Sequence, residues 1–236
     1  MTLQVADRLG AAAGPSCYSR QVNDWWCTDY LVDRQSELVS ATGQHLAITA
    51  AAVALGLALA LPLALLARRY ARLESTVLGV STALYTIPSL ALFPLLLPFT
   101  GLTATTVVIG LALYTLTILV RNMLEGLRAV PDDVRESATG LGYSPVRLLF
   151  RIELPLALPV LMAGLRIATV STVALTTVGS IVSYGGLGNL LASGVNEDFK
   201  AQILAASVLC VLLALALDAL LLGVQRLLTP WTRTAG

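Results

Sequence analysis

Few residues in this chain have the type and spacing that chemistry requires. His45 is the single histidine, and the three cysteines show no metal-ligand spacing, so we expect no metal site. The phosphate-binding pattern G-x-x-x-x-G-K-[ST] is absent, and the only lysine is Lys200. We therefore predict no catalytic residue and no bound cofactor. The chain is expected not to be an enzyme, and it cannot hydrolyse ATP alone.

Two charged residues lie inside long apolar stretches. Arg166 follows Pro155 by eleven residues and Asp218 precedes Arg226 by eight. At about 1.5 Å per residue, each lies roughly 12–16 Å from the end of its helix. Charges at such depth in a membrane face the bundle interior and usually pair. We hypothesise an Arg166–Asp218 contact and favour a structural role for it over substrate binding.

Composition shows what kind of elements must position these residues. The chain has 236 residues, of which 56% are hydrophobic and only 12% charged, and its mean hydropathy is +0.79. About a quarter of the residues in an ordinary globular domain are charged, so this chain has too few polar side chains to cover a soluble core. We predict an all-α, polytopic membrane protein surrounded by lipid. The net charge of +1 gives no indication of nucleic acid binding.

Five stretches are long and apolar enough to cross a bilayer, which takes about 20 residues. They cover residues 46–67, 77–99, 103–120, 154–184 and 203–224. We therefore divide the chain into an N-terminal segment 1–43, a five-span domain 44–228 that contains a polar loop 131–155, and a tail 229–236. Five spans place the two termini on opposite sides of the membrane.

Arginine placement distinguishes the two faces. The segments after the first, third and fifth spans share one face and carry most of the arginines, namely Arg68, Arg69, Arg72, Arg121, Arg128, Arg135, Arg147, Arg151, Arg226 and Arg233. On the other face, Arg8, Arg20, Arg34 and Lys200 are diluted by acidic residues that include Asp24, Asp29, Asp33, Glu37, Glu197 and Asp198. The positive-inside rule puts the N-terminus outside and the polar loop with the C-terminus in the cytoplasm.

The N-terminal segment has features of its own. Residues 21–43 mix Trp25, Trp26 and aliphatic residues with acids, which is typical of an amphipathic helix in the outer interface; a loosely ordered tail is the alternative. Cys17 and Cys27 lie ten positions apart and, outside the cell, could form a disulfide or remain free thiols. For His45, at the corner with the membrane, we expect a hydrogen-bonding role.

The second span contains Pro88, Pro94 and Pro98. Each proline frees a carbonyl that neighbouring protein or water must satisfy, as in a helix that faces a translocation cavity; a kinked packing helix is the alternative. Aromatic side chains that could line such a pathway are Tyr85, Phe93, Tyr114 and Tyr184, although we favour packing or cavity lining over a defined site. The glycines of the turn after the fourth span could form an outer gate or a plain turn: Gly185, Gly186 and Gly188.

The polar loop 131–155 is predicted to form two short helices along the inner membrane surface. Pro131 suits a first helical turn, Gly140, Gly142 and Pro145 break the helix, and a second helix covers residues 145–153. From spacing alone, the loop could equally be a linker that anchors arginines to lipid headgroups. A motif favours another role: E-S-A, three residues, G, nine residues, I-x-L-P. Its members are Glu136, Ser137, Ala138, Gly142, Ile152, Leu154 and Pro155.

This motif resembles the cytoplasmic "EAA" loop of ABC importer permeases, with Ser137 as its one departure. The segments 87–98, 153–166 and 185–194, together with Arg121, look like permeases for glycine betaine, carnitine and choline. The resemblance covers roughly residues 45–226. It implies a type I importer fold in which the loop seats in an ATPase groove and transmits its closure.

The same resemblance implies the partners: two ATPase subunits that bind ATP and Mg, a second permease subunit that is identical or homologous, and an extracytoplasmic binding protein. Two alternatives stay open. One is a permease for another small solute, such as an amino acid or a betaine-like thiol compound. The other is a self-contained secondary transporter or channel, which inverted repeats or acidic residues at the midplane would favour. Neither feature is evident in the sequence.

Overall fold

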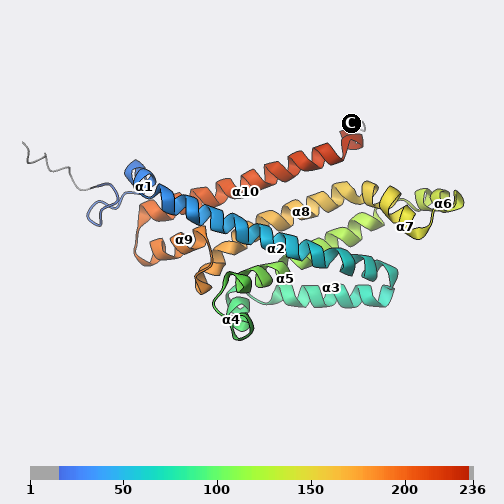
Figure 1. Cartoon of the computed structure of the whole chain (residues 1–236), viewed down its shortest axis with the longest axis horizontal. Helices are drawn as coiled ribbons and strands as arrows, with labels where there is room; N and C mark the ends of the chain where they lie inside the picture. The colour runs from blue at the N-terminus through green and yellow to red at the C-terminus, as the bar shows by residue number, and fades with distance from the viewer. Residues whose placement is uncertain (1–15, 234–236) are drawn as a thin grey trace, which may run out of the picture.

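The computed structural model describes residues 16–233, and within this range every regular element is a helix. Long helices lie side by side along one axis (Figure 1). Four are long and apolar enough to cross a membrane, and a bent pair of helices would make a fifth span. This agrees with the predicted all-α membrane architecture. Residues 1–15 and 234–236, with parts of the predicted N-terminal segment and tail, lie outside the described range.

The first long helix begins earlier than predicted. After the short α1 (Thr28–Asp33), α2 runs without interruption over Gln35–Arg69. It passes through the boundary that we predicted at residue 43, so residues 35–43 are the outer end of the first span and not a separate interfacial helix. Gly43 lies inside this continuous helix. Leu38 is buried against α9 and α10, so the packed face of α2 extends beyond the predicted boundary.

The second span, which we predicted as one helix over residues 77–99, is not a single helix. It is broken into α3 (Ala71–Thr86) and α4 (Ser89–Thr100), which are bent by 101°. The break falls at Ile87, which takes an extended conformation (φ −67°, ψ 124°) because the residue before a proline is driven out of the α region. Pro94 and Pro98 lie inside α4, which remains helical.

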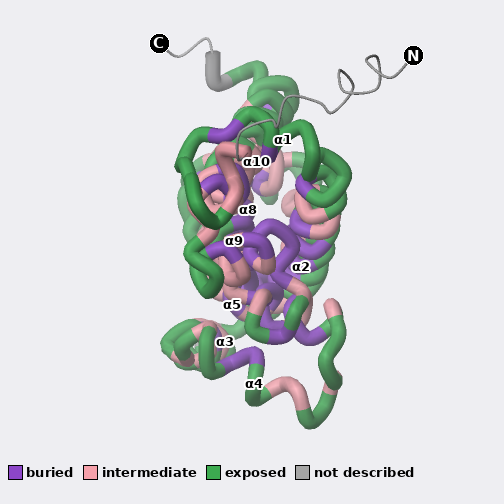
Figure 2. The backbone as a smooth tube through the Cα atoms, turned by 90° about the vertical axis from the view of Figure 1, so that its left-hand side faces the viewer, coloured by how far each residue is buried: buried purple, intermediate pink, exposed green. Residues whose placement is uncertain are grey.

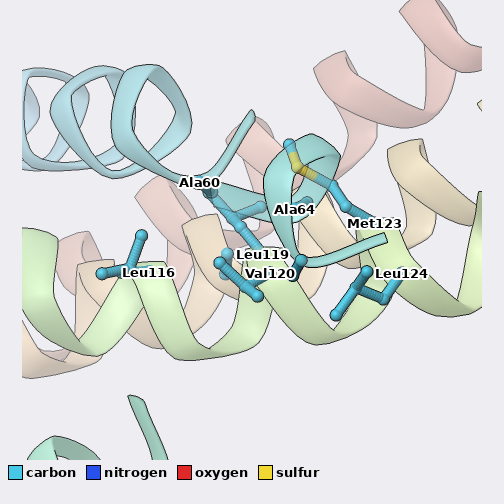
Figure 3. Close-up of a cluster of buried hydrophobic side chains, with 9 residues drawn as sticks. Ala60, Ala64, Leu116, Leu119, Val120, Met123 and Leu124 are labelled. Atoms are coloured by element: carbon cyan, nitrogen blue, oxygen red, sulfur yellow. The ribbon is translucent and has the colours of Figure 1, made fainter. Parts of the chain in front are cut away.

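At the centre of the bundle, α5 (Ala104–Arg128) packs against α2, α3, α4 and α8. Ala60, Ala64 and Ala67 form a stripe of small residues on α2, and the larger side chains of α5 fill the space beside them, as Figure 3 shows for Leu116, Leu119, Val120, Met123 and Leu124. The small stripe allows the two helices to approach closely, as in other membrane helix pairs.

After α5 the chain forms the polar loop: α6 (Asp132–Gly140), α7 (Pro145–Leu148) and a π-helical turn (Leu149–Glu153), which continues into α8 (Leu154–Thr176). A 3₁₀ turn (Thr177–Val182) leads to α9 (Leu187–Asn196), and α10 (Lys200–Leu228) is followed by a last 3₁₀ turn (Pro230–Arg233). Figure 1 shows α6 and α7 at the same end as the C-terminus, with α1 and α9 at the opposite end.

Burial is uneven across the bundle. In Figure 2 the buried backbone is concentrated where α2, α5, α8 and α9 meet, whereas α3 and α4 are exposed over much of their length. In α10, only 11% of the most apolar 18-residue stretch is buried. In a membrane protein, such apolar helix faces lie against lipid or against another subunit.

Candidate functional site

The polar loop 131–155, here called the coupling loop, has the helix–turn–helix shape that the sequence predicts. Pro131 precedes the first residue of α6, and the helix ends at Gly140. Gly142 then takes a left-handed conformation with φ +82°, which other L-residues rarely adopt. Nothing lies within 4 Å of the place where its Cβ would be, so the backbone angle, and not space, favours glycine here.

The motif residues divide into an outer and an inner set. Glu136, Ser137 and Gly142 are exposed, and Ala138 is buried. Ile152, Leu154 and Pro155 are partly buried where the loop joins α8. Between the two sets lies a hollow of about 290 Å³, lined by Asp133, Val134, Ser137, Ala138, Leu141, Tyr143 and Ile152. The loop therefore has a concave side and a free outer surface.

The loop also carries large apolar side chains that are mostly exposed, and one of them, Leu141, borders the hollow. Leu141 is 80% exposed, Val146 66% and Phe150 61%. Arg147 lies over the ring of Tyr143, 4.6 Å from its centroid, and Arg151 is exposed beside them. Large apolar residues that are exposed beside arginines are typical of a protein contact site.

The inner side of the loop is tied to the spans by Glu153, a residue that the sequence analysis did not single out. The Glu153 side chain is only 3% exposed. Its carboxylate accepts a hydrogen bond at 2.6 Å from Arg68 at the end of α2, and a second one from the other terminal nitrogen of Arg68. It also accepts one from Nε of Arg135 in α6, at 3.0 Å. A buried carboxylate is thus shared by two arginines from two different helices.

Arg135 extends this network. Its guanidinium also donates to Asp132, 2.6 Å away, and to the backbone carbonyl of Leu127 in α5. Helices α2, α5 and α6 therefore meet at Glu153 and Arg135 with the π-helical turn that leads into α8. A buried charge is stable only when it is paired and hydrogen-bonded, so these contacts hold the loop in one position relative to the spans. A glutamate directly before the apolar run LPLALP was the sequence signal that could have found it.

Within the spans, the structure brings Arg166 and Asp218 together. Nε of Arg166 donates to Oδ1 of Asp218 at 2.8 Å, and Nη2 donates to Oδ2 at 2.7 Å. The two side chains join α8 to α10.

At the opposite end, Cys17 and Cys27 form a disulfide, and their Cα atoms are 5.6 Å apart. Tyr30 packs edge-on against Phe199, whose ring centroid is 5.2 Å away, and Tyr18 lies beside both rings. Burial of Tyr30 raises its pKa to about 12. These contacts hold the N-terminal segment against the start of α10, while Trp25 and Trp26 stay exposed next to them.

The four predicted pathway aromatics do not form one site. The hydroxyl of Tyr114 donates a hydrogen bond to the carbonyl of Ile87, the extended residue at the break between α3 and α4, and its ring packs edge-on against Tyr85. Phe93 is fully buried and packs against Gly110, where a Cβ would approach its ring to 2.7 Å. Tyr184 is half-buried beside the same core. Tyr114 thus satisfies a carbonyl of the broken span.

The glycine turn is packed tightly against the bundle. Gly186 has φ +56°, and a Cβ on Gly188 would lie 2.2 Å from the carbonyl oxygen of Thr177. The buried His45 lies between two backbone carbonyls, with Nδ1 3.2 Å from that of Gly185 and Nε2 3.0 Å from that of Val173. His45 therefore has the hydrogen-bonding role that we expected, but inside a continuous helix and not at a corner.

With this geometry established, comparison with known proteins is informative. The model of a family described as "Binding-protein-dependent transport system inner membrane component" matches residues 47–234. An osmoprotectant import permease protein of Salmonella typhimurium, OsmW, is 36% identical over 206 residues, 85% of this chain and 96% of that protein. A choline transport system permease protein of Bacillus subtilis, OpuBB, is 32% identical over 201 residues, 85% of this chain and 93% of that protein.

A carnitine transport permease protein of Listeria monocytogenes, OpuCB, is 35% identical over 193 residues, covering 82% of this chain and 88% of that protein. Among solved structures, an inward-facing form of the MetNI methionine ABC transporter superposes with a TM-score of 0.76. It covers 84% of this chain and 98% of that chain at 22% identity, so the likeness concerns the fold alone.

Proposed function

The chain belongs to the family of inner membrane components of binding-protein-dependent transport systems, and we propose that it is the permease subunit of an importer for small quaternary ammonium osmoprotectants. Glycine betaine, carnitine and choline are the candidate solutes. The support is that the relatives named for osmoprotectant, choline and carnitine transport each cover more than four-fifths of this chain. ATP and Mg are bound by a separate ATPase.

Membership of the family implies an ATPase and a binding protein as partners. Beyond that, we infer two ATPase subunits and a second permease, identical or homologous, because two closing ATPases require two coupling loops. The apolar faces of α3, α4 and α10 offer surface for the second permease. An extracytoplasmic binding protein would dock on the end that carries α1 and α9.

We propose that the N-terminus lies outside and that the coupling loop and C-terminus lie in the cytoplasm. The support is twofold. The arginine-rich segments gather at the end that carries α6, α7 and the C-terminus, as the positive-inside rule requires. The Cys17–Cys27 disulfide lies at the opposite end, and such bonds persist in oxidising compartments.

One arrangement carries this function: the coupling loop is exposed on its outer side and fixed on its inner side. Leu141, Val146 and Phe150 are free to enter an ATPase groove, while Glu153 joins α6 to α2 and α8. A displacement of the outer surface would therefore reach two spans through a buried ion-pair network. A loop that merely rests on lipid headgroups needs no such buried anchor.

We also place the translocation pathway beside the α3–α4 break. Pro88 turns the chain by 101° there, and Tyr85 and Phe93 flank the bend. The turn that contains Gly185, Gly186 and Gly188 would act as the outer gate, because its tight contacts with the Thr177 backbone allow few intermediate positions. Two-state packing of this kind is what alternating access requires.

Reconstitution tests the proposal. The permease, its ATPase and its binding protein are placed in liposomes with ATP inside, and uptake of radiolabelled glycine betaine, carnitine and choline is measured. We expect uptake of at least one of them that requires all three components. Uptake by the permease alone would instead indicate a secondary transporter or channel. Uptake of amino acids but of no quaternary ammonium compound would contradict the proposed substrate class.

A further inference from the structure

The Arg166–Asp218 pair lies in the spans but is not sealed. Arg166 is in α8 and Asp218 in α10, each about 15 Å from the nearer helix end at about 1.5 Å per residue. Two parallel hydrogen bonds of 2.8 and 2.7 Å join them. Even so, 26% of the Arg166 side chain and 33% of the Asp218 side chain remain exposed.

The exposed side of the pair forms the wall of a cavity of about 510 Å³, within the range of small-molecule sites, which is about 300–1,000 Å³. Its other lining residues are small or apolar: Ala163, Ile167, Val170, Ser171, Ala214 and Leu215. Ionised groups at membrane depth face the bundle interior or a water-filled cavity and not the hydrocarbon. This cavity therefore belongs to the transport route or to an assembled interior.

A purely structural tie between α8 and α10 does not explain the opening. The two helices also pack along their length, and Gln225 of α10 reaches the Pro159 carbonyl of α8. The attraction between the two charges would be stronger if they were closed off from water, because it weakens as the surrounding dielectric rises. Here small side chains such as Ala214 leave room beside both charges.

The geometry points to a binding site for a zwitterionic solute at this pair, and this inference rests on the proposed function. Within residues 16–233, Nη1 of Arg166 bonds to no acceptor, so it can donate to the carboxylate of a solute. The quaternary ammonium group of the same solute would lie against the Asp218 carboxylate. The ammonium needs no hydrogen bond, since an opposite charge and an apolar wall suffice.

This arrangement has a consequence for selectivity. The pair is neutral as a whole, with opposite charges fixed side by side. A zwitterion aligned antiparallel to it is attracted at both ends. A simple cation such as choline is attracted by Asp218 but repelled by Arg166 at nearly the same distance. The site should therefore accept glycine betaine and carnitine in preference to choline, although choline carries the same trimethylammonium group.

Binding to the purified permease–ATPase complex, without binding protein, tests this directly. The probe is radiolabelled glycine betaine, with unlabelled carnitine and choline as competitors. We expect displacement by choline to require at least tenfold more competitor than displacement by carnitine. The double variant R166Q/D218N keeps polar groups of similar shape but no charges, and should weaken binding at least tenfold. Ala214→Leu fills the cavity without altering either charge, and should do the same.

Two controls are matched to these variants. Ala216→Leu makes the same change at an exposed position of α10, and E74Q/R128Q neutralises an ion pair between α3 and α5. Both should bind glycine betaine within twofold of the unaltered complex. The inference is overturned if R166Q/D218N and Ala214→Leu assemble and bind as the unaltered protein does, or if choline competes as well as carnitine.

The two proposals fail in different ways. If the complete system imports glycine betaine but the purified complex binds none at millimolar concentration, only the intramembrane site is wrong. If the complete system imports no quaternary ammonium compound, the proposed function itself is wrong. If R166Q/D218N fails to assemble while Ala214→Leu binds glycine betaine as the unaltered complex does, the pair has a structural role and the proposed site is rejected.

Discussion

Replacing Glu153 by glutamine should disconnect the coupling loop from the spans. The carboxylate accepts three hydrogen bonds from Arg68 and Arg135. Glutamine keeps one acceptor oxygen, but its amide NH₂ would face a guanidinium donor that now bonds the second oxygen at 2.6 Å. The substitution therefore removes a charge and breaks at least one hydrogen bond. It also places the amide NH₂ donor of glutamine against the guanidinium donor of Arg68.

The magnitude follows from the burial of the network. Breaking a buried ion pair by removing one partner costs about 3–5 kcal/mol. Because the side chains of Arg68 and Arg135 are 30% and 24% exposed, water can solvate them in part, and we expect the lower end, about 3 kcal/mol. At about 1.4 kcal/mol for each factor of ten, the docked position of the loop would be disfavoured roughly 100-fold.

The assay is ATP-driven solute uptake by the reconstituted complex, together with the ATPase rate with and without liganded binding protein. Glu153→Gln should lower uptake at least tenfold and remove the stimulation of ATPase by binding protein, while the basal ATPase rate persists. Glu125→Gln is the control. It makes the same chemical change at an exposed carboxylate near the end of α5 that leads into the coupling loop.

A double-mutant cycle with Arg135→Gln shows whether the two residues act together. If they do, the double variant should be little worse than either single variant, because contacting residues give non-additive effects. Additive losses, or wild-type stimulation in Glu153→Gln, would refute the reasoning.

Three further predictions concern other parts of the chain. Gly142→Ala should impair uptake, because a left-handed conformation costs an alanine about 1–2 kcal/mol, whereas Gly140→Ala, at an open helical position, should not; equal uptake by both variants would contradict this. Tyr114→Phe should lower thermal stability by about 1 kcal/mol through loss of its bond to Ile87, with Tyr85→Phe unchanged as the control. C17S/C27S should increase proteolysis of the N-terminal segment, since removing a disulfide that closes so short a loop costs about 3 kcal/mol, and it should leave the basal ATPase rate unaltered.

Much of the architecture could be predicted because a bilayer restricts what a chain can do. Apolar runs long enough to span a bilayer, with an arginine-bearing loop between them, were enough to indicate an all-α membrane protein. They also indicated that the polar loop lies at the same end of the bundle as the C-terminus. The break at Gly142 and the helix start after Pro131 follow from local backbone preferences, which hold in almost any context.

Other features depend on tertiary contacts that no local pattern contains. Residues 35–43 looked like an interfacial helix because their composition is mixed, yet packing of Leu38 against α9 and α10 makes them the end of α2. Residues 77–99, with three prolines, were expected to form one helix, but the chain breaks at Pro88 and remains helical at Pro94 and Pro98. The Ile87 carbonyl at the break is satisfied by Tyr114, which lies on another helix. Glu153 was missed since its partners, Arg68 and Arg135, are distant in sequence.

Cross-linking from the coupling loop tests the central claim most directly. A cysteine at Ser137, on the exposed side of α6, is combined with single cysteines along the groove of the partner ATPase. We predict a disulfide cross-link whose yield changes when ATP closes the ATPase pair. Two results would contradict the account. One is the absence of any cross-link in an assembled, active complex. The other is labelling of that cysteine from outside intact cells by a membrane-impermeant thiol reagent.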